Sequence, residues 1–336
     1  PKRKLNIHPT PNNQSMNELR KDYLTDKWVI IASVRAKRPH DFKTPKEENN
    51  AANCFFCPGK EYTTPPEIYR VEKDSKWIIR VIPNKFPAVI PYGVSEIKTD
   101  NSFYTYASAY GRHEIVIETN EHGREIEDLP VDHIKKILRT FIFRIDELMK
   151  DPLIDYVSVF KNKGKSAGAS IAHTHSQIIA YNNIPSAIKN ELESSYRYYV
   201  LNKKCAFCDI ISKEKNSHRR VLKTKHTIAF TPYASRFPFE IWLFPKRHVA
   251  GIGELNEDEL LDFSASLKKI LTKLKEIGNV PYNILFHSMT DKSANFHFHI
   301  EILPRLTVWA GFELETGTII NPVSPEDAAK FYRNEM

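Results

Sequence analysis

The sequence predicts an α+β fold made of two copies of one domain, each with an antiparallel sheet packed by a long helix. Three observations predict it: a repeat at constant spacing, one C-x-x-C pair in each half, and one H-x-H strand in each half. We expect one domain at residues 1–192 and the other at 193–336. The polar stretch KNELESSYRYYVLNKK (189–204) is expected to bridge them.

Composition limits the class of protein. The 336 residues are 41% hydrophobic and 27% charged, as in ordinary globular proteins of two domains. No apolar run approaches the roughly 18 residues of a membrane helix, so we expect a cytoplasmic protein without a membrane partner. A formal charge of +8 favours anionic partners, and a phosphate-bearing small molecule fits as well as nucleic acid does.

The repeat is clearest where HEIVIETNEHGREIEDL (113–129) aligns with FEIWLFPKRHVAGIGEL (239–255). His122 aligns with His248 at an offset of 126 (248 − 122 = 126). The apolar positions that follow match at the same offset and recur every three or four residues. Each half is therefore expected to contain an amphipathic helix.

Beyond the helix, both halves continue with two strands. The apolar strands YVSVF (156–160) and YNILF (282–286) again match at the offset of 126 (282 − 156 = 126). Loops then lead to AHTHSQIIA (172–180) and FHFHIEILP (296–304). Because side chains alternate along a strand, the two histidines of each H-x-H motif are expected on the same face.

The four cysteines form two similar pairs, CFFC (54–57) and CAFC (205–208). A thioredoxin-like redox pair would open a helix within a βαβ unit, and neither pair has that setting. In a cytosolic chain with thirteen histidines, two such pairs indicate metal binding before disulfides.

The repeat nominates the ligands as equivalent sets of two thiols and two imidazoles. Four protein ligands make a closed, structural site, and thiolates with imidazoles favour zinc, although iron is possible at the second site. In the second half the alignment of the H-x-H motifs selects His297, whereas the constant offset selects His299. The predicted sets are Cys54, Cys57, His122 and His173, and Cys205, Cys208, His248 and His297.

The two halves differ in the loop before the H-x-H strand. NKGKSAGAS (162–170) carries glycines, serines and lysines suited to cradling a phosphate, whereas HSMTDKSAN (287–295) has no glycine. Gln177 follows the first motif, and Glu301, which would repel a phosphate, follows the second. The first half is therefore predicted to be active, with His175 free for chemistry if His173 binds metal.

The sequence resembles the galactose-1-phosphate uridylyltransferase family, a duplicated branch of the histidine-triad superfamily, over nearly the whole chain. Its motif N-x-G-x-x-x-G-x-S-x-x-H-x-H-x-Q is matched from Asn162 to Gln177. LTDKWVIIASVRAKRP (24–39) and VIPNKFPAV (81–89) are similar to the family's opening and its nucleotide-pocket strand. The resemblance implies two histidine-triad-like domains and a homodimer.

The resemblance also implies a reaction. His175 would attack the α-phosphorus of UDP-glucose, hold UMP as a nucleotidyl-histidine and pass it to a hexose 1-phosphate such as galactose 1-phosphate, with ping-pong kinetics. Gln177 would assist this chemistry. His113 receives no role. The implied substrate-binding residues are Arg35, Arg38, Asn84, Asn162, Gly168, Ser170, Phe312 and Glu313.

The sequence departs from the family at 307–329, where the best-known members carry lysine, tyrosine and glutamine that grip the hexose phosphate. Phe312 stands in the place of the tyrosine, next to Glu313, and this region has no lysine or glutamine. The ending and the central H-T-H are more similar to the plant ADP-glucose phosphorylase branch. The alternative function is therefore adenylyl transfer from ADP-glucose to inorganic phosphate.

A zinc-stabilised nucleic-acid-binding module is a more distant alternative. However, the ligand pairs are much farther apart than in zinc fingers (122 − 57 = 65 in the first half), and basic residues are interleaved with acidic ones. We therefore expect a nucleoside diphosphate sugar and a sugar 1-phosphate as partners, and no nucleic acid.

Overall fold

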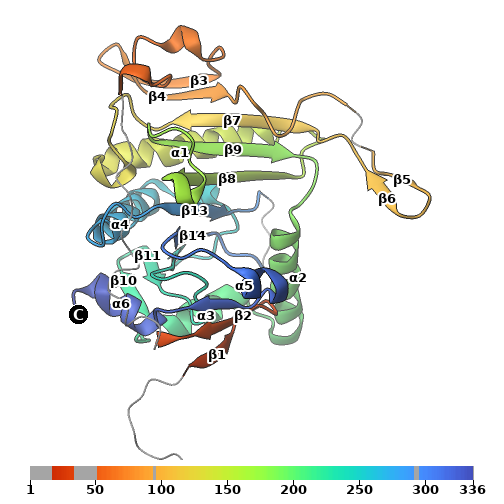
Figure 1. Ribbon diagram of the computed structural model, residues 1–336, viewed down its shortest axis with the longest axis vertical. Coiled ribbons are helices and arrows are strands. Elements are labelled where there is room, and N and C mark those ends of the chain that lie inside the picture. The colour runs from red at the N-terminus through yellow and green to blue at the C-terminus, as the bar shows by residue number, and fades with distance from the viewer. Residues whose placement is uncertain (1–16, 34–50, 94–95, 291–294, 336) are drawn as a thin grey trace, which may run out of the picture.

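The computed structural model describes residues 17–33, 51–93, 96–290 and 295–335. Its main element is a ten-stranded sheet in which all neighbouring strands are antiparallel (Figure 1). From one edge to the other the strands are β3 (Tyr69–Lys73), β4 (Lys76–Pro83), β7 (Gly111–Ile117), β9 (His175–Tyr181), β8 (Tyr156–Lys163), β13 (Tyr282–His287), β14 (His299–Pro304), β12 (Ile241–Pro245), β11 (Thr227–Phe230) and β10 (Arg220–Lys223).

The strand order repeats in mirror image about the centre of the sheet. Five strands from the first half of the sequence are followed by five from the second, and β8 pairs with its counterpart β13 in the middle. The α+β class and the duplication are thus confirmed, and the two predicted sheets join edge to edge into one. At the junction Asn162 lies opposite Asn283.

The long helices predicted by the repeat are α1 (Val131–Leu148) and α4 (Glu257–Lys275), which pack together against one face of the sheet. Their apolar stripes meet alternate strand residues such as Val116, Ile178 and Ile300, all fully buried. Because side chains alternate along a strand, the other residues of β7 and β9, including His175, face away from these helices.

Different elements cover the opposite face in the two halves. In the first half the CFFC segment packs on Trp77, Ile82 and Ile117. In the second half α2 (Ser186–Asn202) and α3 (Ala206–Glu214) cover an aromatic cluster that includes Phe207 and Phe244. Most of the predicted bridging stretch is helical, and the proposed domain boundary near residue 192 lies within α2.

The N-terminal strands lie at the far end of the molecule, against the second half. β1 (Glu18–Lys21) and β2 (Trp28–Ile31) form a three-stranded sheet with β15 (Ile319–Asn321), which is parallel to β2. This sheet is followed by α6 (Pro325–Arg333). The side chain of Arg20 forms an ion pair with Glu326 at 3.0 Å, which links the two ends of the described chain.

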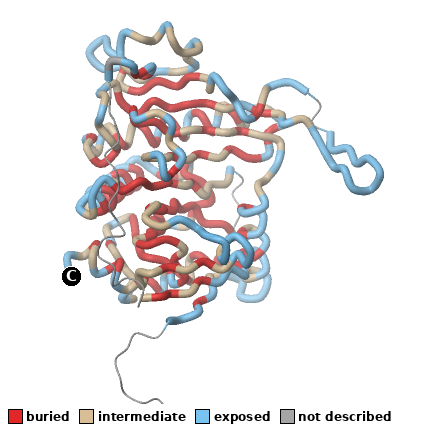
Figure 2. The backbone as a smooth tube through the Cα atoms, viewed as in Figure 1, coloured by how far each residue is buried: buried red, intermediate tan, exposed pale blue. Residues whose placement is uncertain are grey.

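A short hairpin of β5 (Lys98–Asp100) and β6 (Tyr104–Tyr106) projects from the body, and Figure 2 shows that its residues are exposed. The remaining helix, α5 (Gly311–Thr316), precedes β15. Within the described part of the chain, no helix is long and apolar enough to cross a membrane.

Candidate active site and metal centres

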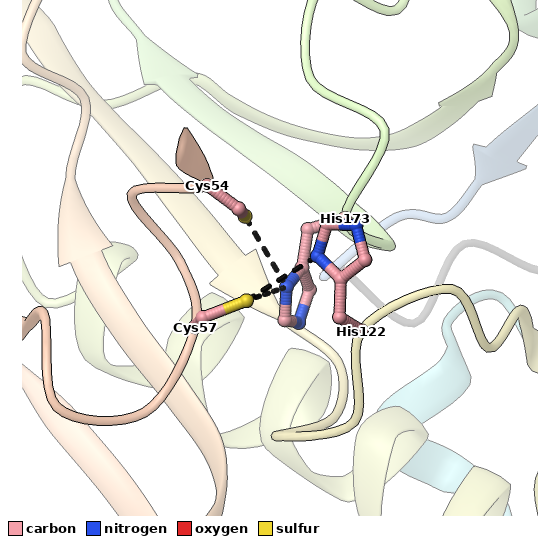
Figure 3. A group of neighbouring side chains, drawn as sticks. All are labelled: Cys54, Cys57, His122 and His173. Carbon is pink, nitrogen blue, oxygen red and sulfur yellow. Dashed lines mark hydrogen bonds between the residues drawn. The ribbon is translucent and has the colours of Figure 1, made fainter. Parts of the chain in front are cut away.

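The first predicted ligand set comes together on the sheet face opposite the long helices (Figure 3). Cys54 and Cys57 belong to the segment that covers this face, His122 follows β7, and His173 precedes β9. One ligand atom from each residue lies within 4.8 Å of the other three. The Sγ–Nδ1 distances are 3.5 Å for Cys54–His173, 3.3 Å for Cys57–His122 and 3.7 Å for Cys57–His173.

These separations fit a bound metal. Tetrahedral zinc with Zn–S of about 2.3 Å and Zn–N of about 2.0 Å places sulfur and nitrogen about 3.5 Å apart. His173 Nε2 lies 2.8 Å from the Thr119 carbonyl oxygen, which can only accept, so this nitrogen carries the proton. The lone pair of Nδ1 therefore faces the thiols, as a metal ligand requires. Burial, helped by Cys54, raises the pKa of Cys57 to about 11, and a divalent cation would reverse this by stabilising the thiolates.

The second set is built in the same way in the second half. Cys208 Sγ lies 3.4 Å from His248 Nδ1 and 3.5 Å from His297 Nδ1, and Cys205 completes the group. His297 Nε2 donates a hydrogen bond to the Pro245 carbonyl oxygen, 2.9 Å away, which leaves Nδ1 facing the thiols. The structure therefore groups His297, not His299, with the thiols, as the motif alignment predicts. The constant offset fails here because β14 starts 124 residues after β9 (299 − 175 = 124).

His175 is buried at the start of β9, and its ring makes a T-shaped contact with the Phe56 ring, with centroids 5.5 Å apart. Its Nδ1 lies 2.8 Å from the His173 carbonyl oxygen, so Nδ1 carries the proton and donates a hydrogen bond to that oxygen. Nε2 is left with its lone pair. Burial lowers the pKa of His175, and the charge of Lys161 lowers it further. The fold thus presents a neutral imidazole whose Nε2 keeps its lone pair, which is the form that a nucleophilic histidine requires.

The loop between β8 and β9 shapes a cavity of about 850 Å³ at this histidine. Gly164 and Gly168 have φ of 81° and 89°, a backbone region that favours glycine. A Cβ on Gly164 would also lie 2.9 Å from the Pro281 side chain. The cavity is lined by Asn162, Ser170 and His175 together with residues 278–281 of the second half. Such a loop can place backbone N–H groups against an anion.

Strand register gathers further polar side chains on the same face. Ile115 lies opposite Gln177, and His113 lies two residues before Ile115, so His113 and Gln177 are diagonal neighbours. Gln177 Oε1 is 2.8 Å from His113 Nε2. The Asn84 N–H donates to the His113 carbonyl at 2.8 Å. His113, which the sequence left without a role, therefore connects two of the predicted site residues.

Two of the predicted substrate-binding residues lie away from this cavity. Phe312 and Glu313 are in α5, where Glu313 Oε2 accepts a hydrogen bond from the Ala310 N–H at 3.0 Å. Neither is among the described residues that line the cavity at His175. Arg35 and Arg38 lie outside the described residues.

A buried ion pair beside β9 was not predicted from the sequence. Lys161 Nζ lies 2.7 Å from Glu118 Oε2 and 2.6 Å from Thr174 Oγ1. The Ser176 hydroxyl donates to Glu118 Oε1 at 2.5 Å. The residues on both sides of His175 are thereby tied to the other face of the sheet. The signal is that Lys161 continues the buried face of Val157 and Val159 along β8, because a buried charge requires a partner.

The corresponding place in the second half is not suited to a phosphate. His299 Nδ1 lies 2.9 Å from the His297 carbonyl, as in the first half, but its Nε2 lies 3.4 Å from Glu191 Oε1. Glu191, His287 and His299 form a separate group of possible ligands. A carboxylate at the position of an incoming phosphate would repel it, which distinguishes the second copy from the first.

Comparisons with known proteins agree with this geometry. Residues 8–185 match a family described as galactose-1-phosphate uridyl transferase, N-terminal domain, and residues 124–335 match a domain of unknown function, DUF4921. The chain is 36% identical to an ADP-glucose phosphorylase of Arabidopsis thaliana, over 96% of this chain and 93% of that protein. It is 28% identical to a galactose-1-phosphate uridylyltransferase of Thermotoga maritima, over 95% and 98%.

The similar solved structures include the same two kinds of enzyme, an ADP-glucose phosphorylase and a uridylyltransferase. A crystal structure of an ADP-glucose phosphorylase from Arabidopsis thaliana with bound ADP-glucose superimposes with a TM-score of 0.80 and 34% identity, over 95% of this chain and 99% of that one. A structure of a uridylyltransferase gives a TM-score of 0.75 and 27% identity, over 95% and 98%. Both likenesses extend over both halves of the sheet.

Proposed function

The chain belongs to the galactose-1-phosphate uridylyltransferase family, and we propose that it is a nucleotidyltransferase that carries a nucleoside monophosphate on His175. The observation that carries the proposal is the hydrogen bond from His175 Nδ1 to the His173 carbonyl, at 2.8 Å. It leaves a lone pair on Nε2 beside the loop that is suited to phosphate.

The proposed reaction has two balanced steps. In the first, the Nε2 lone pair forms a bond to the α-phosphorus of a nucleoside diphosphate sugar, and the bond to the bridging oxygen breaks to release the sugar 1-phosphate. In the second, a phosphate oxygen of the acceptor attacks the same phosphorus and the N–P bond breaks, which returns the lone pair to Nε2. The proton stays on Nδ1 throughout and remains hydrogen-bonded to the His173 carbonyl oxygen.

Several residues are proposed to hold the phosphates during these steps. Ser170 and the loop around Gly168 lie against the cavity, and Asn162 and Gln177 share the sheet face of His175. Donors at these positions would offset charge that develops on the phosphoryl oxygens. From the family resemblance we also propose that Asn84 lines the nucleotide pocket, that Arg35 and Arg38 act as cationic clamps, and that Phe312 and Glu313 contact the sugar phosphate.

The proposed substrates are UDP-glucose and a hexose 1-phosphate such as galactose 1-phosphate. This choice is supported by the matched family model and by the Thermotoga maritima relative. A second candidate is adenylyl transfer from ADP-glucose to inorganic phosphate. It is favoured by the higher identity to the plant ADP-glucose phosphorylase, and by the absence of lysine and glutamine from residues 307–329.

We propose zinc in both Cys₂His₂ groups, with iron as an alternative in the second. The mixed thiol and imidazole donors and the S–N separations near 3.5 Å support this choice. The metal would stabilise the folded chain and would take no part in the reaction, because four protein ligands leave no open position. Near His175 it would fix His173, and so would aim the next imidazole along the strand.

A cytoplasmic homodimer, without nucleic-acid or membrane partners, completes the proposal and rests on the family resemblance. Light scattering after gel filtration tests the assembly, because a dimer would have twice the 39.0 kDa mass of one chain. Oligonucleotide binding that weakens steeply with salt would instead favour the nucleic-acid alternative.

Isotope exchange tests the proposed reaction. Incubation of UDP-glucose, labelled in its glucose, with unlabelled glucose 1-phosphate should move label into the sugar phosphate without a third substrate, because the first step is reversible. Exchange with ADP-glucose but not with UDP-glucose would establish the second candidate instead. No exchange with either nucleotide sugar would contradict a covalent nucleotidyl intermediate.

A further inference from the structure

The side chain of His113 is held from two sides, and the two contacts determine its protonation. The Ala88 N–H lies 3.2 Å from His113 Nδ1. A backbone N–H can only donate, so Nδ1 accepts and carries no proton. In the neutral ring the proton then lies on Nε2, which is 2.8 Å from Gln177 Oε1. His113 therefore donates to the amide oxygen of Gln177.

The surroundings favour this neutral ring. His113 is half-buried, and burial lowers its pKa even though its hydrogen bond to Gln177 acts in the opposite direction. The Asn84 amide nitrogen lies 3.2 Å from His113 Nε2 and cannot also donate to it while that nitrogen donates to Gln177. The Asn84 side-chain oxygen accepts from the Phe86 N–H at 2.9 Å, which fixes that amide separately.

The contact matters because an amide has two unlike ends. With Oε1 bonded to His113, Gln177 keeps its NH₂ group as the end available to a ligand. Gln177 lies on β9 two residues from His175, so the two side chains share a face of the sheet. If the amide turned over, its oxygen would face the phosphoryl oxygens and would repel them instead of donating to them.

We propose that His113 is a positioning residue that orients the amide of Gln177 toward the phosphoryl group on His175. This inference rests on the proposed nucleotidyl transfer. His113 acts through Gln177 and does not itself touch the reacting atoms. The segment 84–88 holds the imidazole through the Ala88 N–H and through the backbone bond from Asn84, so it sets the orientation of the amide indirectly.

Two substitutions separate positioning from simple packing. In His113→Phe a ring of similar size remains but the donor is lost, and the rate of nucleotidyl-His175 formation in a single turnover should fall roughly tenfold to a hundredfold. In His113→Gln the side-chain NH₂ can take the place of Nε2–H and should recover most of that rate. His218→Phe, at an exposed histidine of the second half, is the matched control.

A double-mutant cycle tests whether His113 acts through Gln177. Gln177→Ala alone should slow the step, and adding His113→Phe to it should slow the step little further, because the amide to be oriented is already absent. If the rate loss in the double variant equals the product of the two single losses, the proposal is overturned. Equal rates for wild type and His113→Phe would do the same, as would a failure of His113→Gln to recover rate above His113→Phe.

A spectroscopic measurement keeps this inference separate from the proposed function. In protein with ¹⁵N-labelled histidine rings, His113 should show the Nε2–H tautomer, and the Gln177 side-chain amide signals should shift in His113→Phe but not in His218→Phe. An Nδ1–H tautomer, or Gln177 signals unchanged by His113→Phe, would overturn the positioning role. If the wild-type chain forms no adduct with either nucleotide sugar, the proposed nucleotidyl transfer is refuted instead. The spectra would still show whether His113 donates a hydrogen bond to Gln177.

Discussion

Asn283 Nδ2 donates a hydrogen bond to Asn162 Oδ1 at 2.8 Å, and this bond joins the second half of the chain to the start of the glycine-containing loop of the first half. The same nitrogen lies 2.8 Å from the Ala167 carbonyl, and Arg305 lies 3.3 Å from Asn283 Oδ1. The second half of the chain thus supplies a side chain that binds both Asn162 and the Ala167 carbonyl in the glycine-containing loop.

Asn283→Ala should therefore lower the rate of nucleotidyl transfer, because the loop carbonyl and Asn162 lose their shared donor. We expect the rate of the first step to fall roughly tenfold, as for loss of an oriented group near the transferred phosphate. Single-turnover measurements compare it with Asn202→Ala, an exposed asparagine in α2. Full activity in Asn283→Ala would show that the loop needs no support from the second half.

The Lys161–Glu118 pair should be required for stability. Lys161→Met leaves the Glu118 carboxylate buried without its cation, and we expect a loss of about 3–5 kcal/mol in the free energy of unfolding. Urea denaturation measures this loss, with Lys189→Met at an exposed site as the control. Adding Glu118→Gln to Lys161→Met should recover part of the loss, since the buried charge is then removed. An unchanged free energy of unfolding in Lys161→Met would contradict the buried ion pair.

The two metal centres should differ in their effect on activity. Elemental analysis should find two metal ions per chain, and Cys54→Ser and Cys205→Ser should each lose one. Both variants should melt at lower temperature, because each structural site stabilises the folded state. Cys54→Ser should slow nucleotidyl transfer more, since its site holds the histidine two residues before His175. Equal activity in the two variants would contradict that link.

Acid should weaken the second half through Glu301. Burial alone would raise the pKa of this carboxyl, but Arg236, His287 and His299 outweigh burial and lower it to about 2. A lowered folded-state pKa contributes stability above the unfolded value of about 4.5, and that contribution is lost as the pH falls toward 2. Glu301→Gln should therefore be less stable than wild type at pH 6, and the gap should narrow by pH 3. Urea titrations against Glu193→Gln check this, and a gap independent of pH would contradict it.

Much of the site could be predicted from the sequence because the repeat supplies an internal alignment. Thiols and imidazoles at equivalent places in two copies defined both ligand sets, and the structure gathers both. The choice between His297 and His299 needed the structure, because the segment from the start of β13 to the start of β14 is two residues shorter than the segment from β8 to β9 (299 − 282 = 17 against 175 − 156 = 19).

The roles that were missed depend on contacts between strands. His113 reaches Gln177 only through the register of β7 on β9, and Asn283 meets Asn162 only because the two half-sheets join at β8 and β13. Alternating apolar residues predict that a strand is buried, but they do not tell which edges pair. Likewise, nothing in residues 18–31 indicates that they add to the strand at Ile319–Asn321.

Intact-protein mass spectrometry tests the central claim most directly. The chain is incubated with UDP-glucose or, separately, with ADP-glucose, and compared with His175→Gly treated in the same way. The account predicts that one nucleoside monophosphate is added to the wild-type chain and none to the variant. The mass of the adduct identifies the base. An unmodified wild-type chain with both nucleotide sugars, or an adduct that persists in His175→Gly, would contradict the assignment of His175 as the nucleophile.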